Sequence, residues 1–415
     1  RITMSEDCVL QGSKFGMALS WDHSQTVADL DLQAVAFNNT GKLLDAVYYN
    51  NLKALRGLTH SGDETTGAKK GFDECIWVYP QKLPDDVTLV LFVVACYKGG
   101  CIRDAKNAKF HVLEDVLSHE VGTFGLEKAV DKAALVGSLT RTPSGAWSFR
   151  ALDIPARHGQ HFIDILEPTI GNYVRTLIPG APRKIKAAFA MDKGSVVDLP
   201  ESNKVIETCA GLGWDTTQGE VDLDVSAIML DSHGSEVDCC FFGNQEAQGI
   251  KHSGDNLTGE GAGDDEVITL SLEALAAEVK QIFFIINIYT PGRTFYDVAN
   301  PYCRLFSAQG EEFCRYQLRE AGHEQALIMA RMFREPGDSR WGFQALGVPC
   351  KGKTYKDSMP SVVQYCMTKP TDRSLMRQTT TMSDFDGPGS QPVAGRSLVE
   401  SASKESTCGA SCSVQ

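Results

Sequence analysis

An acidic, glycine-containing stretch occurs twice in this chain, as His60-Ser61-Gly62-Asp63-Glu64-Thr65-Thr66-Gly67 and as His252-Ser253-Gly254-Asp255-Asn256-Leu257-Thr258-Gly259. Each copy leads into a second acidic group, Gly71-Phe72-Asp73-Glu74 in the first and Gly263-Asp264-Asp265-Glu266 in the second. Carboxylates on loops that glycine makes flexible supply the oxygen ligands that hard cations prefer. The repeat therefore predicts bound cations rather than a catalytic nucleophile.

The register of the repeat extends far beyond these loops. Trp21-Asp22 corresponds to Trp214-Asp215, 193 positions later, and Trp147 corresponds to Trp341, 194 positions later. This period is much longer than the roughly 20–50 residues of solenoid repeats. We conclude that the chain contains two whole domains in tandem.

The domain boundaries follow from length and composition. A chain of 415 residues is long enough for two or three domains, each with its own core. Residues 177–182 contain two prolines and a glycine, so we place domain one at residues 1–176 and domain two at residues 183–369. Residues 370–415 are rich in serine and lack a core-forming pattern, so we expect a disordered tail there.

Within each domain the apolar runs have the length and composition of strands. The runs Val87 to Ala95 and Ile282 to Ile286 are rich in β-branched and aromatic residues, and they predict strands buried on both faces. Asp222-Leu223-Asp224-Val225 alternates, which puts the two aspartates on one strand face. Short peripheral helices are expected at residues 159–173, 271–278, 320–330 and 356–365. The pattern favours a mainly antiparallel β-sandwich in each domain.

Composition excludes some classes of partner. The net charge of −13 argues against nucleic acid, because phosphate binding needs clustered Lys and Arg. No apolar run reaches the length of a bilayer-spanning helix. The 13 cysteines have no spacing that repeats between the domains, so we expect reduced thiols in a cytoplasmic protein rather than disulfides or a zinc site.

Domain two carries a series of short motifs: Lys193-Gly194, Gly211-Leu212-Gly213-Trp214-Asp215, Asp222-Leu223-Asp224, His252-Ser253-Gly254-Asp255, the run Thr258 to Glu266, and Trp341-Gly342-Phe343. In this order they resemble the TerD family of tellurium-resistance proteins. Domain one carries a weaker copy of the same motifs. The resemblance implies two tandem TerD-like β-sandwiches that bind calcium in acidic loops at one end. It also implies a role in stress or chemical resistance.

The candidate calcium ligands come from separate acidic segments. Domain two supplies Asp215, Asp222, Asp224, Asp255, Asn256, Glu260, Asp264, Asp265 and Glu266. Domain one supplies a weaker candidate set, Asp22, Asp29, Asp31, Asp63, Glu64, Asp73 and Glu74. Calcium takes about 6–8 oxygen ligands, so each set suffices in number when backbone carbonyls and water are added.

Comparison of the two copies predicts that domain two is the better calcium site. Asp264 corresponds to Phe72 and Glu260 to Ala68, so two carboxylates are missing from domain one. Lys69-Lys70 adds two ammonium groups to the same loop. We therefore expect domain one to bind one ion weakly, or none.

The leading functional hypothesis is a non-catalytic, calcium-binding tandem module that acts in stress response, chemical resistance or signalling through an unidentified protein partner. His252-Ser253-Gly254-Asp255 contains the residue types of a hydrolase, but neighbours in an extended segment point to opposite faces. One alternative is a small-ligand protein, because tandem copies of this domain occur in slime-mould proteins described as binding cyclic AMP. Another is a metal-dependent enzyme that uses the acidic loops.

The last residues suggest lipid attachment. Cys412-Ser413-Val414-Gln415 fits a prenylation box in which glutamine favours a farnesyl group. Cys408 lies close upstream, where it could accept a palmitoyl group, and two lipids give a stable anchor. One interpretation is a cytoplasmic protein tethered to the cytoplasmic face of a membrane. A cysteine present by chance is the alternative, because Ser413 is not aliphatic.

Overall fold

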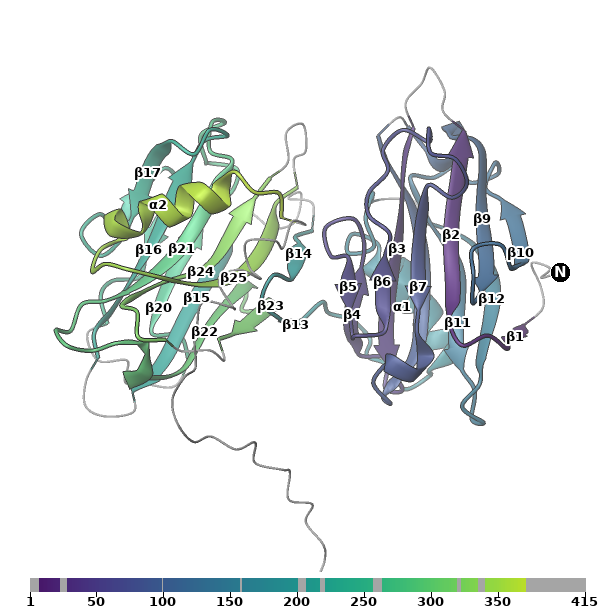
Figure 1. The fold of residues 1–415 in the computed structure, drawn as a ribbon, viewed down its shortest axis with the longest axis horizontal. Coiled ribbons are helices and arrows are strands. Elements are labelled where there is room, and N and C mark those ends of the chain that lie inside the picture. Colours follow the sequence, from purple (N-terminus) through teal and green to yellow (C-terminus); the bar gives the residue numbers. More distant parts are fainter. Residues whose placement is uncertain are drawn as a thin grey trace, which may run out of the picture.

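The chain forms two β-sandwiches that lie side by side (Figure 1). A computed structural model of the protein describes residues 7–22, 28–98, 100–156, 159–200, 207–216, 221–256, 263–318, 322–334 and 340–370. The mainly β, tandem architecture predicted from the repeat is confirmed. The predicted tail, with Cys408 and Cys412, lies outside the described residues except for Pro370.

Domain one consists of two six-stranded sheets. Sheet I has the order β1 (Cys8–Leu10), β12 (Trp147–Ala156), β11 (Ala133–Arg141), β8 (Val87–Lys98), β3 (Asp29–Asn38) and β4 (Leu43–Val47). Sheet II has the order β10 (Glu120–Gly125), β9 (Lys106–Glu114), β2 (Phe15–Asp22), β7 (Glu74–Val78), β6 (Leu58–His60) and β5 (Lys53–Ala54). The paired strands of both sheets are antiparallel.

Domain two repeats this arrangement with one added strand. Sheet III has the order β13 (Phe189–Met191), β23 (Glu312–Gln317), β22 (Val298–Ser307), β15 (Thr208–Thr216), β20 (Glu266–Leu270), β19 (Ile250–His252) and β18 (Glu246–Ala247). Sheet IV has the order β14 (Val196–Asp198), β25 (Gly342–Cys350), β24 (Ala326–Phe333), β21 (Gln281–Ile288), β16 (Leu223–Leu230) and β17 (Glu236–Cys240). The added strand, β13, runs parallel to β23.

The two central strands are buried on both faces, as their sequences predict. On β8, Phe92 packs into the core between sheets I and II, while Leu91 packs with Ile170 and Val174 on the other side. These last two residues belong to η3 (Leu166–Ile170) and α1 (Gly171–Leu177), which cover the outer face of sheet I. On β21 the helix α2 (Tyr355–Cys366) has the same role.

Two of the expected helices are absent and one is shorter. Residues 271–278 form turns, and residues 326–330 belong to strand β24, where pairing with β21 and β25 overrides local helix propensity. The helix that closes domain one begins at Gly171 rather than near residue 159, whereas α2 matches the expected 356–365. Three short 3₁₀ segments complete the described elements: η1 (Pro80–Lys82), η2 (Ile102–Asp104) and η5 (Phe295–Asp297).

The two domains are in direct contact through a buried carboxylate. Asp198 on β14 is only 2% exposed. Its carboxylate accepts hydrogen bonds from the Tyr49 hydroxyl (2.9 Å) and the Asn50 side-chain amide (3.1 Å) of domain one. The Tyr48 hydroxyl accepts from the Asp198 backbone N–H (2.9 Å) and donates to the Val196 carbonyl (3.2 Å). Domain one therefore binds both the backbone and the side chain of β14.

Two class-level observations complete the description. Among the described residues, no helix is both long enough and apolar enough to cross a membrane. Most of the cysteines that the structure describes are buried, and none of those described is paired in a disulfide.

Candidate metal centre

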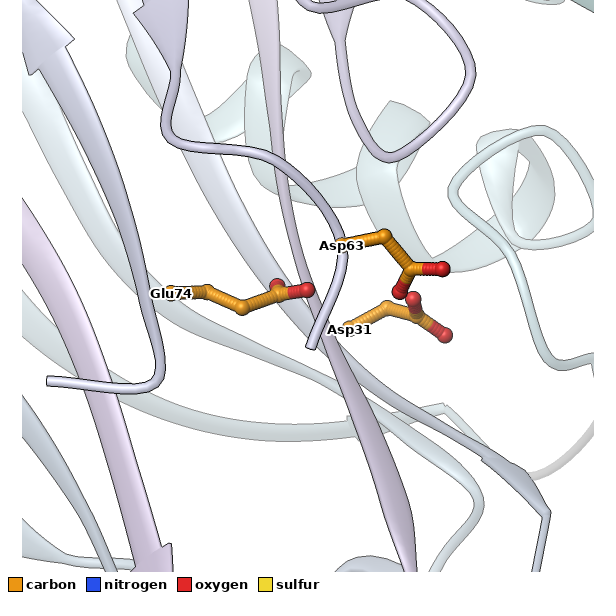
Figure 2. Close-up of side chains that lie close together, drawn as sticks. All are labelled: Asp31, Asp63 and Glu74. Atoms are coloured by element: carbon orange, nitrogen blue, oxygen red, sulfur yellow. The ribbon is translucent and has the colours of Figure 1, made fainter. Parts of the chain in front are cut away.

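Three carboxylates converge at one end of domain one. Asp31 lies on β3, Asp63 lies in the loop after β6, and Glu74 is the first residue of β7. Oxygens of all three lie within 4.8 Å of one another. Figure 2 shows the Asp31 and Asp63 carboxylates close to each other, with the Glu74 side chain extended toward them. We call Asp31, Asp63 and Glu74 the domain-one cluster.

The cluster forms where sheet I meets sheet II. Glu74 begins a strand of sheet II, and its Oε2 accepts a hydrogen bond from the Leu32 N–H of sheet I (2.7 Å). His60 adds a second connection, because its Nε2 lies 3.0 Å from the Leu32 carbonyl oxygen. Gly62 donates to His60 Nδ1 (3.1 Å) and has a φ of 106°, which turns the loop so that Asp63 approaches the cluster. His60 is thus a structural residue of the loop.

Domain two builds a cluster on the same scaffold. Asp222 precedes β16, Asp224 lies on β16, Asp255 lies in the loop after β19, and their oxygens again lie within 4.8 Å of one another. Glu266 Oε2 accepts from the Val225 N–H (3.0 Å), as Glu74 does from Leu32. His252 repeats the role of His60, with Nδ1 accepting from Gly254 (3.1 Å). We call Asp222, Asp224 and Asp255 the domain-two cluster.

Burial and nearby negative charges raise the pKa of three aspartates in or beside the two clusters. Burial raises the pKa of Asp29 to about 7, and the charge of Asp63 adds to the rise. Burial raises the pKa of Asp31 well above its ordinary range, and the nearby charge of Glu74 acts in the same direction. In domain two, burial raises the pKa of Asp224 to about 7, with a further contribution from Asp222. A cation at either cluster would relieve this repulsion.

The donor set fits a hard cation. Asp31 is 3% exposed, and among the described residues nothing hydrogen-bonds to its Oδ2. The buried oxygens Asp29 Oδ1 and Asp222 Oδ1 also lack a partner among those residues. Buried acceptors are ordinarily hydrogen-bonded, so each such oxygen needs an explanation. Carboxylate oxygens in excess of protein donors are the ligands that calcium prefers.

Several predicted ligands lie outside the two clusters and form hydrogen bonds with other side chains or with the backbone. Asp264 pairs with Arg304 (Nη2 to Oδ2, 2.7 Å) and accepts from the Tyr302 hydroxyl (2.9 Å). Asp73 and Asp265 each accept a backbone N–H, from Trp21 and Trp214 respectively (both 2.8 Å). The remaining side chains are held in the following pairs: Asp22 with Asn107, Asp215 with Asn300, Asn256 with Asp265, and Glu64 with Thr66. Glu260 lies outside the described residues.

The placement of Asp264 changes the comparison of the two copies. In domain one, Phe72 replaces Asp264, and the Phe72 ring packs against His111 (centroids 4.8 Å apart). His111 occupies the strand position that Arg304 occupies in domain two, 193 residues later. An ion pair has therefore been exchanged for a ring contact. Asp264 is not a member of the domain-two cluster, so its replacement by Phe72 removes no carboxylate from the corresponding cluster of domain one. The weaker calcium binding expected of domain one stays a prediction.

The sequence did not indicate two lysines that line the cavity beside the domain-one cluster. This cavity of about 400 Å³ is bounded by Asp29, Asp31 and Asp63, and also by Lys98 and Lys369. Lys98 could have been found, because it is the register partner of Asp29 on neighbouring strands. Lys369 belongs to the end of domain two, so only the contact between the domains brings it there.

The chain is thus a tandem of β-sandwiches, each with an acidic cluster at the place where its two sheets meet. The TerD domain family matches residues 8–162 and again residues 187–356, which together make up most of the chain. The chain belongs to the TerD family.

Its relatives have the length of one domain. Tellurium resistance protein TerZ of Serratia marcescens is 36% identical over 186 residues, covering 41% of this chain and 95% of TerZ. General stress protein 16U of Bacillus subtilis (strain 168) is 35% identical over 179 residues, covering 40% and 92%. A crystal structure of a homologue of telluride resistance protein TerD from Streptomyces coelicolor matches with a TM-score of 0.33 at 24% identity, covering 37% and 94%.

Proposed function

We propose that this protein is a calcium-binding module of stress response or chemical resistance, in which each domain holds an ion at its acidic cluster. The observation that carries the proposal is the convergence of three carboxylates in each domain, with buried oxygens that lack a hydrogen-bond donor among the described residues. The domain-one cluster and the domain-two cluster would supply the first ligands. The role in stress response or resistance comes from the relatives, which are named for tellurium resistance and general stress.

We propose that the module acts without catalysis. Ser253 and His252 each have a structural contact that supports this proposal: the Ser253 hydroxyl accepts the Val267 N–H (2.9 Å), and His252 Nδ1 accepts the Gly254 N–H. In domain one, Ser61 accepts the Cys75 N–H in the same way (2.9 Å). These contacts give both motifs a structural role in the loops that carry Asp63 and Asp255.

The other hypotheses remain predictions. Lys98 and Lys369 would suit an anionic ligand such as a cyclic nucleotide, but the described lining of that cavity includes no arginine to clamp a phosphate. A metal-dependent enzyme would need an open coordination position beside bound substrate. Attachment to a membrane through Cys412 and Cys408, and binding of an unidentified protein, also stay predictions.

The proposal predicts that stabilisation by calcium increases with pH. Asp29 and Asp224 have a pKa of about 7 in the folded protein, above the ordinary value for aspartate. Between about pH 4 and pH 7 the ion-free folded protein therefore holds protons that the unfolded chain releases, and stability falls as pH rises. Calcium binds the ionised carboxylates, so its effect should grow over the same range.

Thermal unfolding with calcium and with chelator at several pH values measures this effect. The difference between the two midpoints should widen from about pH 5 to about pH 8. The variant Asp29→Asn/Asp224→Asn is the control, and its difference should be smaller and depend less on pH. A difference that stays constant or narrows toward high pH would contradict the proposed ligands.

A further inference from the structure

The contact between the two domains joins two different surfaces. Domain one contributes the residues that follow β4, Tyr48 and Tyr49, and domain two contributes the edge strand β14. Because the domains are copies, each also carries a counterpart of the surface that the other uses. In domain two, the residues after β17 correspond to the Tyr48 and Tyr49 surface of domain one. In domain one, the edge strand β1 corresponds to β14 of domain two. Figure 1 shows β17 on the far side of domain two and β1 on the far side of domain one.

The structure fixes the equivalence of the first pair of surfaces. Tyr48 forms an isolated bridge with Asn51, and Phe241 forms the same bridge with Asn244, 193 positions later. The ring centroids of Tyr48 and Phe162 are 5.6 Å apart, and those of Phe241 and Tyr355 are 5.5 Å apart. Phe241 therefore stands in the place of Tyr48. It follows that Phe242 stands in the place of Tyr49.

Strand register fixes the equivalence of the second pair. Strand β1 pairs with β12, with Val9 opposite Ser148. Strand β14 pairs with β25 in the same way, with Asp198 opposite Gly342. Ser148 and Gly342 each follow the repeated tryptophan of their domain. Val9 therefore stands in the place of Asp198.

The residues that correspond to Tyr49 and Asp198 are both apolar. Within the chain, the Tyr49 hydroxyl binds the Asp198 carboxylate, and both groups are polar. At the equivalent outer surfaces, Phe242 replaces the hydroxyl-bearing ring and Val9 replaces the carboxylate, so both are apolar. Phe242 is 43% exposed and Val9 is 47% exposed. Tyr49 and Asp198 are in contact, so Phe242 and Val9 occupy positions from which two copies of the chain could make the same contact. Because both side chains are apolar, such a contact would be hydrophobic.

A groove lies on the outer surface of domain two. Phe241, Phe242 and Tyr355 line a cavity of about 240 Å³ there, together with Lys353, Lys356 and Asp224 of the domain-two cluster. The equivalent place in domain one lies against β14. An apolar residue on the edge of a strand is the kind of group that the groove suits, because burial of apolar surface drives such contacts.

We propose that this groove binds strand β1 of a second copy of the chain, with Val9 placed against Phe242. The contact would repeat, between molecules, the contact that joins the two domains within one molecule. It is a heterologous, head-to-tail contact, so each bound copy leaves one groove and one strand free for further copies. The protein would therefore assemble into chains that lengthen as its concentration rises.

Sedimentation velocity of the full chain over a wide range of concentrations tests the proposal, with any purification tag at the C-terminus. The wild type should gain mass as concentration rises. Val9→Asp and Phe242→Asp should each lose this gain, because each variant places a carboxylate where the proposed contact joins two apolar side chains. Val130→Asp is the matched control and should behave as the wild type, since Val130 is also exposed (58%) but lies elsewhere on domain one.

A mixture of the two variants provides the decisive arm. Val9→Asp retains an intact groove and Phe242→Asp retains an intact strand, so an equimolar mixture should form dimers although each variant alone is monomeric. Circular dichroism should show that both variants are folded. A wild type that stays monomeric at every concentration would overturn the proposal. The proposal would also be overturned if Val130→Asp lost the concentration-dependent gain in mass, or if the mixture of Val9→Asp and Phe242→Asp stayed monomeric.

Discussion

Calcium is expected to raise the midpoint of thermal unfolding of the full chain, and a chelator should remove the increase. The physical reason is mass action, because the clusters exist only in the folded state. A free calcium concentration of 100 times the dissociation constant stabilises a protein by about 2.7 kcal/mol for each site. The effect should be large here, since burial and then nearby negative charges raise the pKa of Asp31 and Asp224, and the ion would stabilise their ionised forms.

The controls separate calcium binding from a general effect of salt. Magnesium should give a smaller increase, because it demands octahedral geometry and loses its water reluctantly. Asp31→Asn should remove the contribution of domain one and Asp224→Asn that of domain two. A midpoint that does not move at about 1 mM calcium would contradict the proposal, since even weak protein sites are occupied at that concentration.

Asp198→Ala is expected to lower the free energy of unfolding by about 2–4 kcal/mol, because it leaves buried donors of domain one without an acceptor. The donors are the Tyr49 hydroxyl and the Asn50 amide. Tyr49→Phe removes one of these hydrogen bonds and leaves the carboxylate in place. Its cost should be close to 1 kcal/mol.

Urea unfolding, followed by tryptophan fluorescence and by circular dichroism, measures both variants. If Asp198 couples the domains, the transitions reported by the two signals should lie further apart in Asp198→Ala than in the wild type, with the Arg340–Asp164 ion pair (2.8 Å) remaining as a polar link between the domains. A loss below about 1 kcal/mol with a single transition would show that the contact contributes little to stability.

The fold was predictable because the repeat and the apolar runs are local signals. The runs at Val87 and Ile282 gave strands β8 and β21, which are buried on both faces. The helix expected at residues 271–278 failed, because its apolar residues Leu272 and Leu275 pack from turns instead. Local pattern alone does not distinguish a helix from a compact turn that buries the same residues.

The acidic clusters were predictable only in part. The two copies of the repeat place carboxylates at similar spacings, and this was enough to indicate Asp31, Asp63 and Glu74 as candidate ligands. It was not enough to exclude Asp264, because its partner Arg304 comes from a strand 40 residues away. Asp264 and Arg304 of domain two are both replaced in domain one, by Phe72 and His111. Because both members of the pair change together, the sequence could have indicated that Asp264 and Arg304 are in contact. The contact between the domains had no such local signal.

Isothermal titration of the ion-free chain with calcium measures binding at the two proposed sites. We expect one ion for each of the two clusters, bound more weakly in domain one, with Asp31→Asn and Asp224→Asn each weakening one site at least tenfold, about 1.4 kcal/mol. Asp264→Asn is the matched control, because Asp264 pairs with Arg304 outside the cluster, and it should retain both sites. A wild type that binds no calcium would show that the acidic clusters are not calcium sites. A loss of binding in Asp264→Asn equal to that in Asp224→Asn would contradict the proposed ligands of domain two.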